Sequence, residues 1–302
     1  MTLLRSLPVW LPVLVLLLPG SWLRAQVAQQ EPGSSLDLGV SEIGISFGNS
    51  SRWTGLRFNW SDQSLERIDG LNVTLWKPGD TVGGEVNGIA FGVLGPRAGR
   101  LRGVSLGLLG VLPERSAAGV TIAGLGVVSE GELLGLNVGL LGVVTEGRSV
   151  GVTLGGLGVV TEGGAFGINL AGLGSVSEGP VRGVSLAGLG IVSERSISGI
   201  SLAGLGLVSE TGLRGLSVAG LGAVSGRSID GLVAALAKVD TRQLNGVGVA
   251  AWNRVRVRQR GLTIGLFNQV EQLQGVSIGL LNYAGNNHGL ARWMPLINLH
   301  FD

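Results

Sequence analysis

The sequence predicts an all-β repeat protein, a β-solenoid built from coils of about 14–16 residues. Three observations predict this fold class. A glycine-headed unit recurs at a fixed spacing, glycine supplies 55 of the 302 residues, and aliphatic and polar residues alternate within the unit. Alternation with a period of two is typical of strands. Each glycine inside a helix costs about 1 kcal/mol relative to alanine, so the many glycines exclude a helical repeat.

The repeat unit is 16 residues long, and eight units follow one another without a gap. Counting the first glycine as unit position 1, positions 2 and 4 are always aliphatic, and position 3 is always Ser, Thr or Asn. Position 7 is always leucine and position 8 always glycine, and position 10 is valine in seven of the eight units. The units open at Gly103, Gly119, Gly135, Gly151, Gly167, Gly183, Gly199 and Gly215.

Regular positions of this kind indicate that successive units stack directly on one another. Equivalent residues of stacked coils then lie about 4.8 Å apart, the spacing of strands in a sheet. We expect the aliphatic positions 2, 4, 7 and 10 to form a shared apolar column inside the coil. Beyond the eighth unit the spacing contracts to 15 at Gly231 and Gly246, and to 14 between Gly261 and Gly275.

A second architecture, an outer-membrane up-and-down β-barrel, also fits the unit. Positions 1 to 11 carry no charge in any unit, and this length matches the roughly 9–11 residues of a spanning strand. Barrels, however, alternate short turns with long loops and carry aromatic girdles. Here every connection is short, and residues 103–230 contain a single aromatic residue, Phe166. The solenoid is therefore the preferred prediction, and the barrel remains its alternative.

The two ends of the chain depart from the repeat. Arg5, an apolar run over residues 9–18 and the alanines that follow are typical of a secretory signal peptide. The run contains Pro12 and is shorter than the about 20 residues of a spanning helix. The predicted organisation is a signal peptide (1–25), a polar linker (26–45), an N-terminal β region or cap (46–86), the glycine-rich repeats (87–284) and a C-terminal cap strand (285–302).

Two of the shorter units share a pattern of glycine, aliphatic, any residue, aliphatic, glycine, leucine, apolar and asparagine: GLTIGLFN (261–268) and GVSIGLLN (275–282). This pattern resembles the glycine-rich surface repeats of exported bacterial proteins. WTGLRFNW (53–60), GLNVTLW (70–76) and PLINLHFD (295–302) are similar to the ends of proteins in that group. The resemblance implies a bacterial protein of the periplasm, outer membrane or cell surface, and it implies no activity and no catalytic residues.

Composition argues against several functional classes. Twenty-two basic and 20 acidic residues leave a net charge of +2, far from the concentrated surplus of a nucleic-acid binder. Without cysteine there is no disulfide framework and no thiol nucleophile. His288 and His300 have no partner at metal-ligand spacing, and no serine stands out as a triad nucleophile. We expect no enzyme and no cofactor, but a structural or surface-interaction role; the alternative is a barrel that forms a pore or an anchor.

Seven glutamates occupy unit position 12. In stacked coils their carboxylates would be neighbours at about 4.8 Å, where like charges repel by roughly 1 kcal/mol in water. Divalent cations could bridge them, arginines could interleave, or the side chains could splay into solvent at a turn. The candidates for metal binding are Glu130, Glu146, Glu162, Glu178, Glu194 and Glu210, with Glu114 opening the series.

The segment RVRVRQR places arginines at Arg254, Arg256, Arg258 and Arg260. On one strand this spacing would direct all four guanidinium groups to the same face and the two valines to the other. Such a face suits an anionic partner, and we expect envelope lipid, lipopolysaccharide or another acidic surface polymer. The alternative is an edge strand whose charges prevent pairing with other sheets.

Overall fold

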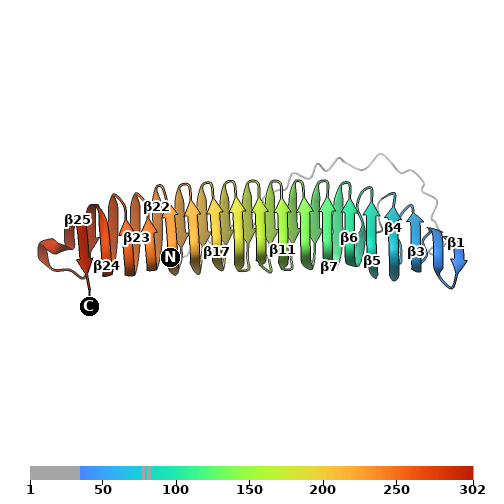
Figure 1. Ribbon diagram of the computed structural model, residues 1–302, viewed down its shortest axis with the longest axis horizontal. Coiled ribbons are helices and arrows are strands. Elements are labelled where there is room, and N and C mark those ends of the chain that lie inside the picture. The colour runs from blue at the N-terminus through green and yellow to red at the C-terminus, as the bar shows by residue number, and fades with distance from the viewer. Residues whose placement is uncertain (1–34, 77–78, 80–82, 302) are drawn as a thin grey trace, which may run out of the picture. The chain divides into compact units, whose positions relative to one another are not determined.

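The structure is a computed structural model that describes residues 35–76, 79 and 83–301. These residues form a β-solenoid of about 14 stacked coils, so the predicted fold class is confirmed (Figure 1). The expected signal peptide, residues 1–25, lies outside the described residues. The same is true of the first part of the expected linker.

Each coil of the central region contains a strand of seven or eight residues and a strand of four. The longer strands are β9 (Glu132–Gly139), β11 (Ser149–Gly155), β13 (Ala165–Ala171), β15 (Val181–Ala187), β17 (Ser196–Ala203), β19 (Gly212–Ala219) and β21 (Ser228–Ala235). The short strands are β8 (Gly126–Ser129), β10 (Gly142–Thr145), β12 (Gly158–Thr161), β14 (Gly174–Ser177), β16 (Gly190–Ser193), β18 (Gly206–Ser209) and β20 (Gly222–Ser225).

Neighbouring coils pair in parallel and in register. In the pairing of β15 with β17, Gly183 faces Gly199 and Leu186 faces Leu202. Equivalent unit positions are therefore direct neighbours, and the arrows of successive coils point the same way in Figure 1. An up-and-down barrel would pair consecutive strands antiparallel. The alternative barrel architecture is therefore wrong.

The stack begins earlier than the sequence indicates. Its N-terminal elements are β1 (Ser35–Val40), β2 (Ile43–Gly48), β3 (Arg52–Asn59), β4 (Arg67–Thr74), β5 (Glu85–Gly92), β6 (Arg97–Gly107) and β7 (Gly110–Ala123). β1 pairs antiparallel with β2, and β2 then starts the parallel series with β3. Residues 35–45 of the expected linker thus lie mostly in strands, because Ile43 and Ile45 continue the two-residue alternation.

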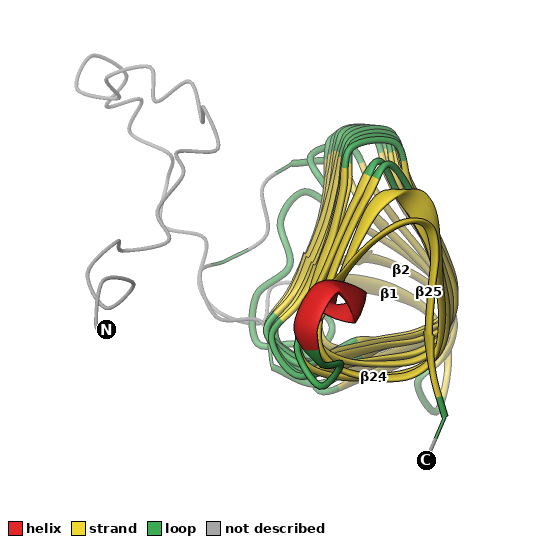
Figure 2. Ribbon diagram, turned by 90° about the vertical axis from the view of Figure 1, so that its left-hand side faces the viewer, coloured by secondary structure: helices red, strands yellow, loops and turns green. Residues whose placement is uncertain are grey.

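The C-terminal coils have longer strands and end in an antiparallel strand. Their elements are β22 (Lys238–Val249), β23 (Trp252–Ile264), β24 (Phe267–Ala284), the 3-10 helix η1 (Gly289–Arg292) and β25 (Trp293–His300). β25 pairs antiparallel with β24 and covers the last coil. Figure 2 shows η1 and β25 at this end, with the preceding coils superimposed behind them.

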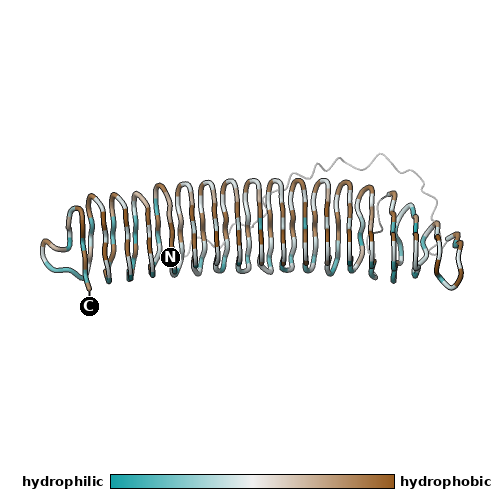
Figure 3. The backbone as a smooth tube through the Cα atoms, viewed as in Figure 1, coloured by the Kyte–Doolittle hydropathy of each residue, from teal (hydrophilic) through white to brown (hydrophobic). Residues whose placement is uncertain are grey.

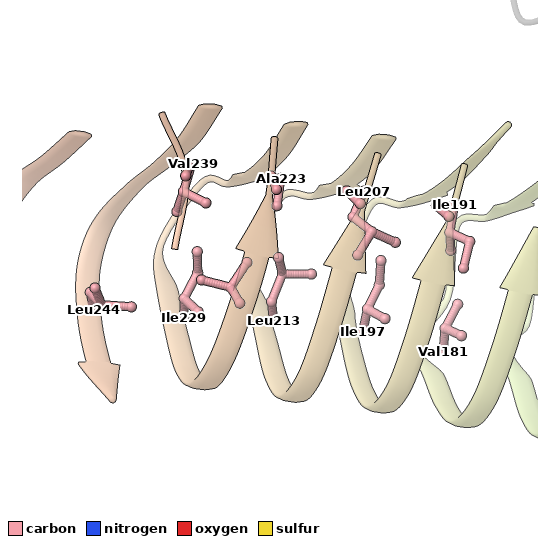
Figure 4. Packing of buried hydrophobic residues seen from close by; sticks show 14 of the residues in the cluster. Val181, Ile191, Ile197, Leu207, Leu213, Ala223, Ile229, Val239 and Leu244 are labelled. Atoms are coloured by element: carbon pink, nitrogen blue, oxygen red, sulfur yellow. The ribbon is translucent and has the colours of Figure 1, made fainter. Parts of the chain in front are cut away.

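Unit positions 3, 5, 9, 11 and 15 fill the interior. In the coil that starts at Gly183 these positions are Ser185, Ala187, Ile191, Ser193 and Ile197, and all five are buried. Figure 4 shows positions 9 and 15 of successive coils pointing toward one another from the short and the long strands. The core is therefore a row of branched aliphatic side chains flanked by rows of small or hydroxyl-bearing ones.

The predicted apolar column at positions 2, 4, 7 and 10 is wrong, because these positions lie on the outer surface. Leu189 at position 7 is 48 % exposed and Val192 at position 10 is 40 % exposed. Alternation along each strand explains the inversion: once positions 3 and 5 point inward, positions 2 and 4 must point outward. The interior takes serine and alanine at positions 3 and 5, and aliphatic side chains such as Leu207 and Leu213 at positions 9 and 15.

A steric rule explains the glycine at unit position 1. Gly199 has φ of +108°, a conformation that L side chains rarely adopt. A Cβ at this residue would lie 2.1 Å from the carbonyl oxygen of Gly183 in the preceding coil. The glycines at position 1 therefore stack on one another where the backbone bends between the two halves of the long strand.

Candidate functional site

The outer surface of the repeat region carries two rows of side chains that the sequence motif defines. The leucine row is formed by position 7: Leu109, Leu125, Leu141, Leu157, Leu173, Leu189, Leu205 and Leu221. The glutamate row is formed by position 12: Glu114, Glu130, Glu146, Glu162, Glu178, Glu194 and Glu210. Brown segments gather toward the upper bends in Figure 3, and teal segments occur at the lower bends.

The leucine row lies on a corner where the backbone is held tightly. The amide of Leu205 donates a hydrogen bond of 2.7 Å to the carbonyl of Leu189, and the amide of Gly206 donates to the same carbonyl at 3.0 Å. The same pair of hydrogen bonds to one leucine carbonyl recurs from coil to coil. With the backbone groups occupied, the leucine side chains project outward, and they are between 44 and 54 % exposed.

From Glu130 to Glu210, the glutamate row lies on the turn between each short strand and the next long strand, whereas Glu114 lies within β7. The amide of Glu194 donates to the carbonyl of Ser177 at 3.0 Å, which fixes the backbone, while its side chain is exposed. Glu114 differs, because Arg97 contacts its carboxylate at 3.1 Å. Among the described residues, no three His, Asp or Glu side chains are close enough to hold a metal ion. Bridging of this row by divalent cations stays a prediction.

The arginine segment lies on β23, which is not an edge strand. β23 pairs with β22 on one side and with β24 on the other. The alternative function of these arginines, protection of a free sheet edge, is therefore wrong. A register shift between Val255 and Arg258 marks a corner in the strand.

This register shift contains Arg256, with Arg254 before it and Arg258 and Arg260 after it. None of the four arginines is buried, whereas Val255 and Gln259 between them are, so all four stay on the outer side of the coil. The corner also breaks the alternation of the valines, since Val255 is buried while Val257 is 42 % exposed.

The guanidinium groups make few charged contacts. Arg256 contacts the carboxylate of Asp240 at 2.8 Å. Arg258 and Arg260 donate to amide oxygens of the next coil, those of Gln272 at 3.3 Å and Gln274 at 3.0 Å. Hydrogen bonds to neutral amide oxygens orient these two guanidinium groups without neutralising them. The surface around the corner therefore retains positive charge that a phosphate or carboxylate could meet.

A charged hollow of about 670 Å³ on the N-terminal coils was not predicted. In it, Arg52 contacts Glu66 at 2.5 Å and Arg67 contacts Asp69 at 2.7 Å. Hydrogen bonds from Arg67 and Asn87 hold the pKa of Asp69 below its ordinary value. The signal that could have located this hollow is the run of charged residues at equivalent positions of β3, β4 and β5, which only the in-register pairing brings together.

The interior of the same coils holds a buried ion pair, Arg57 with Asp62, both with side chains that are 0 % exposed. Arg57 also donates to Asn72 at 2.7 Å, and Asn59 donates to Asp62 at 2.6 Å. A buried charge of this kind is costly unless it is paired and hydrogen-bonded, as both groups are here. The same coils bury Trp53, Leu65 and Ile68, so a polar network and an apolar cluster share their interior.

The two histidines lie near the C-terminal end of the stack, away from the leucine and glutamate rows. His300 contacts the side chain of Asn287 through its Nδ1 at 2.5 Å, and His288 precedes η1. In the part of the chain that the structure describes, no helix has the length and apolar character needed to cross a membrane.

No protein-family model matches this chain, and the comparisons with curated proteins and with solved structures found no match either. The resemblance to the surface repeats of exported bacterial proteins therefore stays a prediction based on the motif. The function has to be argued from the geometry of the outer surface.

Proposed function

We propose that this chain is a non-enzymatic, exported repeat protein of the bacterial cell envelope with a structural or surface-interaction role. One observation supports this proposal: the coil directs its most regular side chains outward. The interior takes serines and alanines at positions 3 and 5 and one set of aliphatic side chains at positions 9 and 15, while further leucine and valine rows run along the outside. Extended apolar surface of this kind is typical of sites at which proteins associate with other molecules.

We propose that the arginines at the corner of β23 form a binding surface for an anionic partner. Its proposed partner is a phosphate-bearing envelope lipid, lipopolysaccharide included. Arg254, Arg256, Arg258 and Arg260 supply the positive charge. Arg256 contacts the carboxylate of Asp240, whereas Arg258 and Arg260 donate to amide oxygens. Guanidinium groups bind phosphate oxygens with charge-assisted hydrogen bonds, which are stronger than bonds between neutral groups.

Co-sedimentation of the full chain with vesicles tests this partner. We expect retention on vesicles that contain phosphatidylglycerol, less retention on pure phosphatidylcholine, and release as salt rises. Replacing the four arginines at 254, 256, 258 and 260 with glutamine should reduce retention on the anionic vesicles at least about 10-fold.

A control variant removes the same net charge elsewhere. It replaces four exposed arginines of other coils, Arg182, Arg195, Arg214 and Arg227, with glutamine. Retention close to that of the unmodified chain is expected for this control. Equal loss in both variants would show a response to net charge alone, and it would contradict a specific role of β23.

The proposed location is tested separately by expressing the full chain in a bacterium and fractionating the cells. We expect the protein in the periplasmic or outer-membrane fraction. Recovery in the cytoplasmic fraction, alongside a cytoplasmic marker enzyme, would contradict export and with it the envelope role.

A further inference from the structure

An apolar trench of about 750 Å³ runs along the central coils beside the leucine row. It is formed by unit positions 4, 5 and 6, from Val138 to Val218. Its wall is the row of aliphatic side chains at position 4, such as Leu170 and Leu186, and its floor is glycine or alanine. The floor lies at the level of the backbone, because a Cβ on Gly188 would lie 2.1 Å from the carbonyl oxygen of Gly172.

The trench has a defined length. Position 6 is glycine in the five coils from Gly156 to Gly220 but leucine in the coils on either side. Leu140 closes one end of the trench and is 66 % exposed. Leu236 stands at the same unit position beyond the other end, where its amide bonds to the carbonyl of Gly220, and it is 76 % exposed.

The leucine row is a ridge that matches this trench. It follows the trench by one unit position, so both features repeat at the same spacing of about 4.8 Å, and the ridge runs beside all six coils that line the trench. A ridge of side chains fits into a neighbouring groove when both repeat at one spacing. A second copy of this chain provides such a ridge, whereas a lipid surface has no matching period.

A two-fold axis allows both contacts at once. When two copies lie antiparallel, the ridge of each enters the trench of the other, which is the self-complementary contact of a symmetric dimer. Leu140 and Leu236 then act as stops that limit sliding along the trench. Unit positions 1 to 11 carry no charge in these coils, so no charged group loses its hydration in the contact.

The area is close to the lower limit for a stable dimer. Six coils at about 4.8 Å and six residues across at about 3.3 Å give an apolar face of roughly 29 by 20 Å. Two such faces bury about 1,150 Å² in total, against roughly 1,200–2,000 Å² for stable, specific interfaces. We propose that two copies of this chain associate antiparallel through the leucine row and the trench. This inference is independent of the proposed envelope role.

Sedimentation velocity of the full chain in detergent-free buffer tests the proposal. We expect a dimer at micromolar concentration. Replacing Leu157, Leu173 and Leu189 with glutamine in one variant should weaken dimerisation at least about 100-fold. A trench variant with Leu154, Leu170 and Leu186 replaced by glutamine should weaken it similarly, because each copy contributes a ridge and a trench. Circular dichroism of each variant checks that the strands still form.

The matched control replaces Val160, Val176 and Val192 with glutamine. These valines lie in the same coils and are between 40 and 42 % exposed, but they are on the short strands, away from the trench. The control should remain a dimer. A dimer that persists in the folded leucine variant, or is lost in the valine control, would overturn the proposal.

A monomer at all concentrations up to about 100 µM would also overturn it. If that monomer bound phosphatidylcholine vesicles and the folded leucine variant did not, the apolar face would be a lipid-binding surface instead. The anionic-vesicle assay on the arginine variants is unaffected by either outcome. Failure of the dimer and failure of the proposed function are therefore distinguishable.

Discussion

The leucine row and the glutamate row lie at two corners of the same coils and are stacked at the same spacing. The residues next to the leucines are nearly constant from unit to unit, whereas those next to the glutamates vary. Around position 7 the order Gly-Leu-Gly occurs in six of the eight units, with a leucine before the row in the other two. After position 12 the chain continues with Gly-Glu, Gly-Arg, Gly-Gly, Gly-Pro, Arg-Ser or Thr-Gly. Backbones approach closely at both corners, because a Cβ on Gly131, which follows Glu130, would lie 1.7 Å from the carbonyl oxygen of Arg115. The glutamate turn nevertheless accepts several residue types, whereas the leucine row keeps one residue type on the surface. Regularity in this repeat therefore does not report burial of the side chain.

Adding one methyl group at each corner should give the largest difference between them. A Cβ on Gly204, beside the leucine row, would lie 1.9 Å from the carbonyl oxygen of Gly188. A Cβ on Gly212, beside the glutamate row, would lie 3.3 Å from its nearest atom. We expect Gly204→Ala to lower the free energy of unfolding by on the order of 3 kcal/mol, since the neighbour is backbone. Gly212→Ala should change it by less than about 1 kcal/mol.

Urea denaturation followed by circular dichroism measures both glycine variants. Equal losses would show that the backbone is packed alike at Gly204 and Gly212.

Truncating two leucines of one coil should give the next largest difference. Leu207 at position 9 is 0 % exposed, and Leu205 at position 7 is 48 % exposed. Leu207→Ala should cost about 2–4 kcal/mol of unfolding free energy, and Leu205→Ala less than about 1 kcal/mol. Denaturation at two protein concentrations separates folding from any association through Leu205. A greater loss for Leu205→Ala would restore the aliphatic column at positions 2, 4, 7 and 10 as the core.

This pair of leucines marks the limit of what the sequence could predict. The 16-residue period, the parallel stacking and the strand content follow from the repeat, because only in-register coils demand the same residue type at the same position. The repeat does not determine which unit positions point into the interior. Positions 2 and 4 alternate with positions 3 and 5, so either set could face inward, and hydrophobicity favoured the wrong one. In the structure, positions 3 and 5, here Ser185 and Ala187, face inward.

Prediction of the functional residues from the sequence was limited in the same way. The spacing of Arg254, Arg256, Arg258 and Arg260 is plain in the sequence, but the corner at which they lie depends on a register shift against the neighbouring coils. The sequence did not predict the trench, because the trench forms only when the side chains at position 4 point outward. The length of the trench, in contrast, can be read from the sequence. It corresponds to the run of coils with glycine at position 6 between Leu140 and Leu236.

Removing charge from the glutamate row should give the smallest effect, and with the opposite sign. Glu162 lies between Glu146 and Glu178 in the stack, and exposed like charges at this spacing repel weakly. Replacing these three with glutamine should raise the melting temperature by about 1–2 °C at low salt and by less at 0.5 M NaCl. Glu132→Gln is the matched control, because Glu132 contacts Arg148 at 2.8 Å, and its loss should not stabilise the protein.

Calcium distinguishes screening of this row from specific binding to it. If the carboxylates only splay into solvent, 1 mM calcium should raise the melting temperature no more than sodium chloride of equal ionic strength. A larger rise that disappears in the variant of Glu146, Glu162 and Glu178 would show that cations bridge successive coils. The two corners would then differ in a further respect: the leucine row would be held by backbone contacts alone, and the glutamate row by an ion that its side chains share.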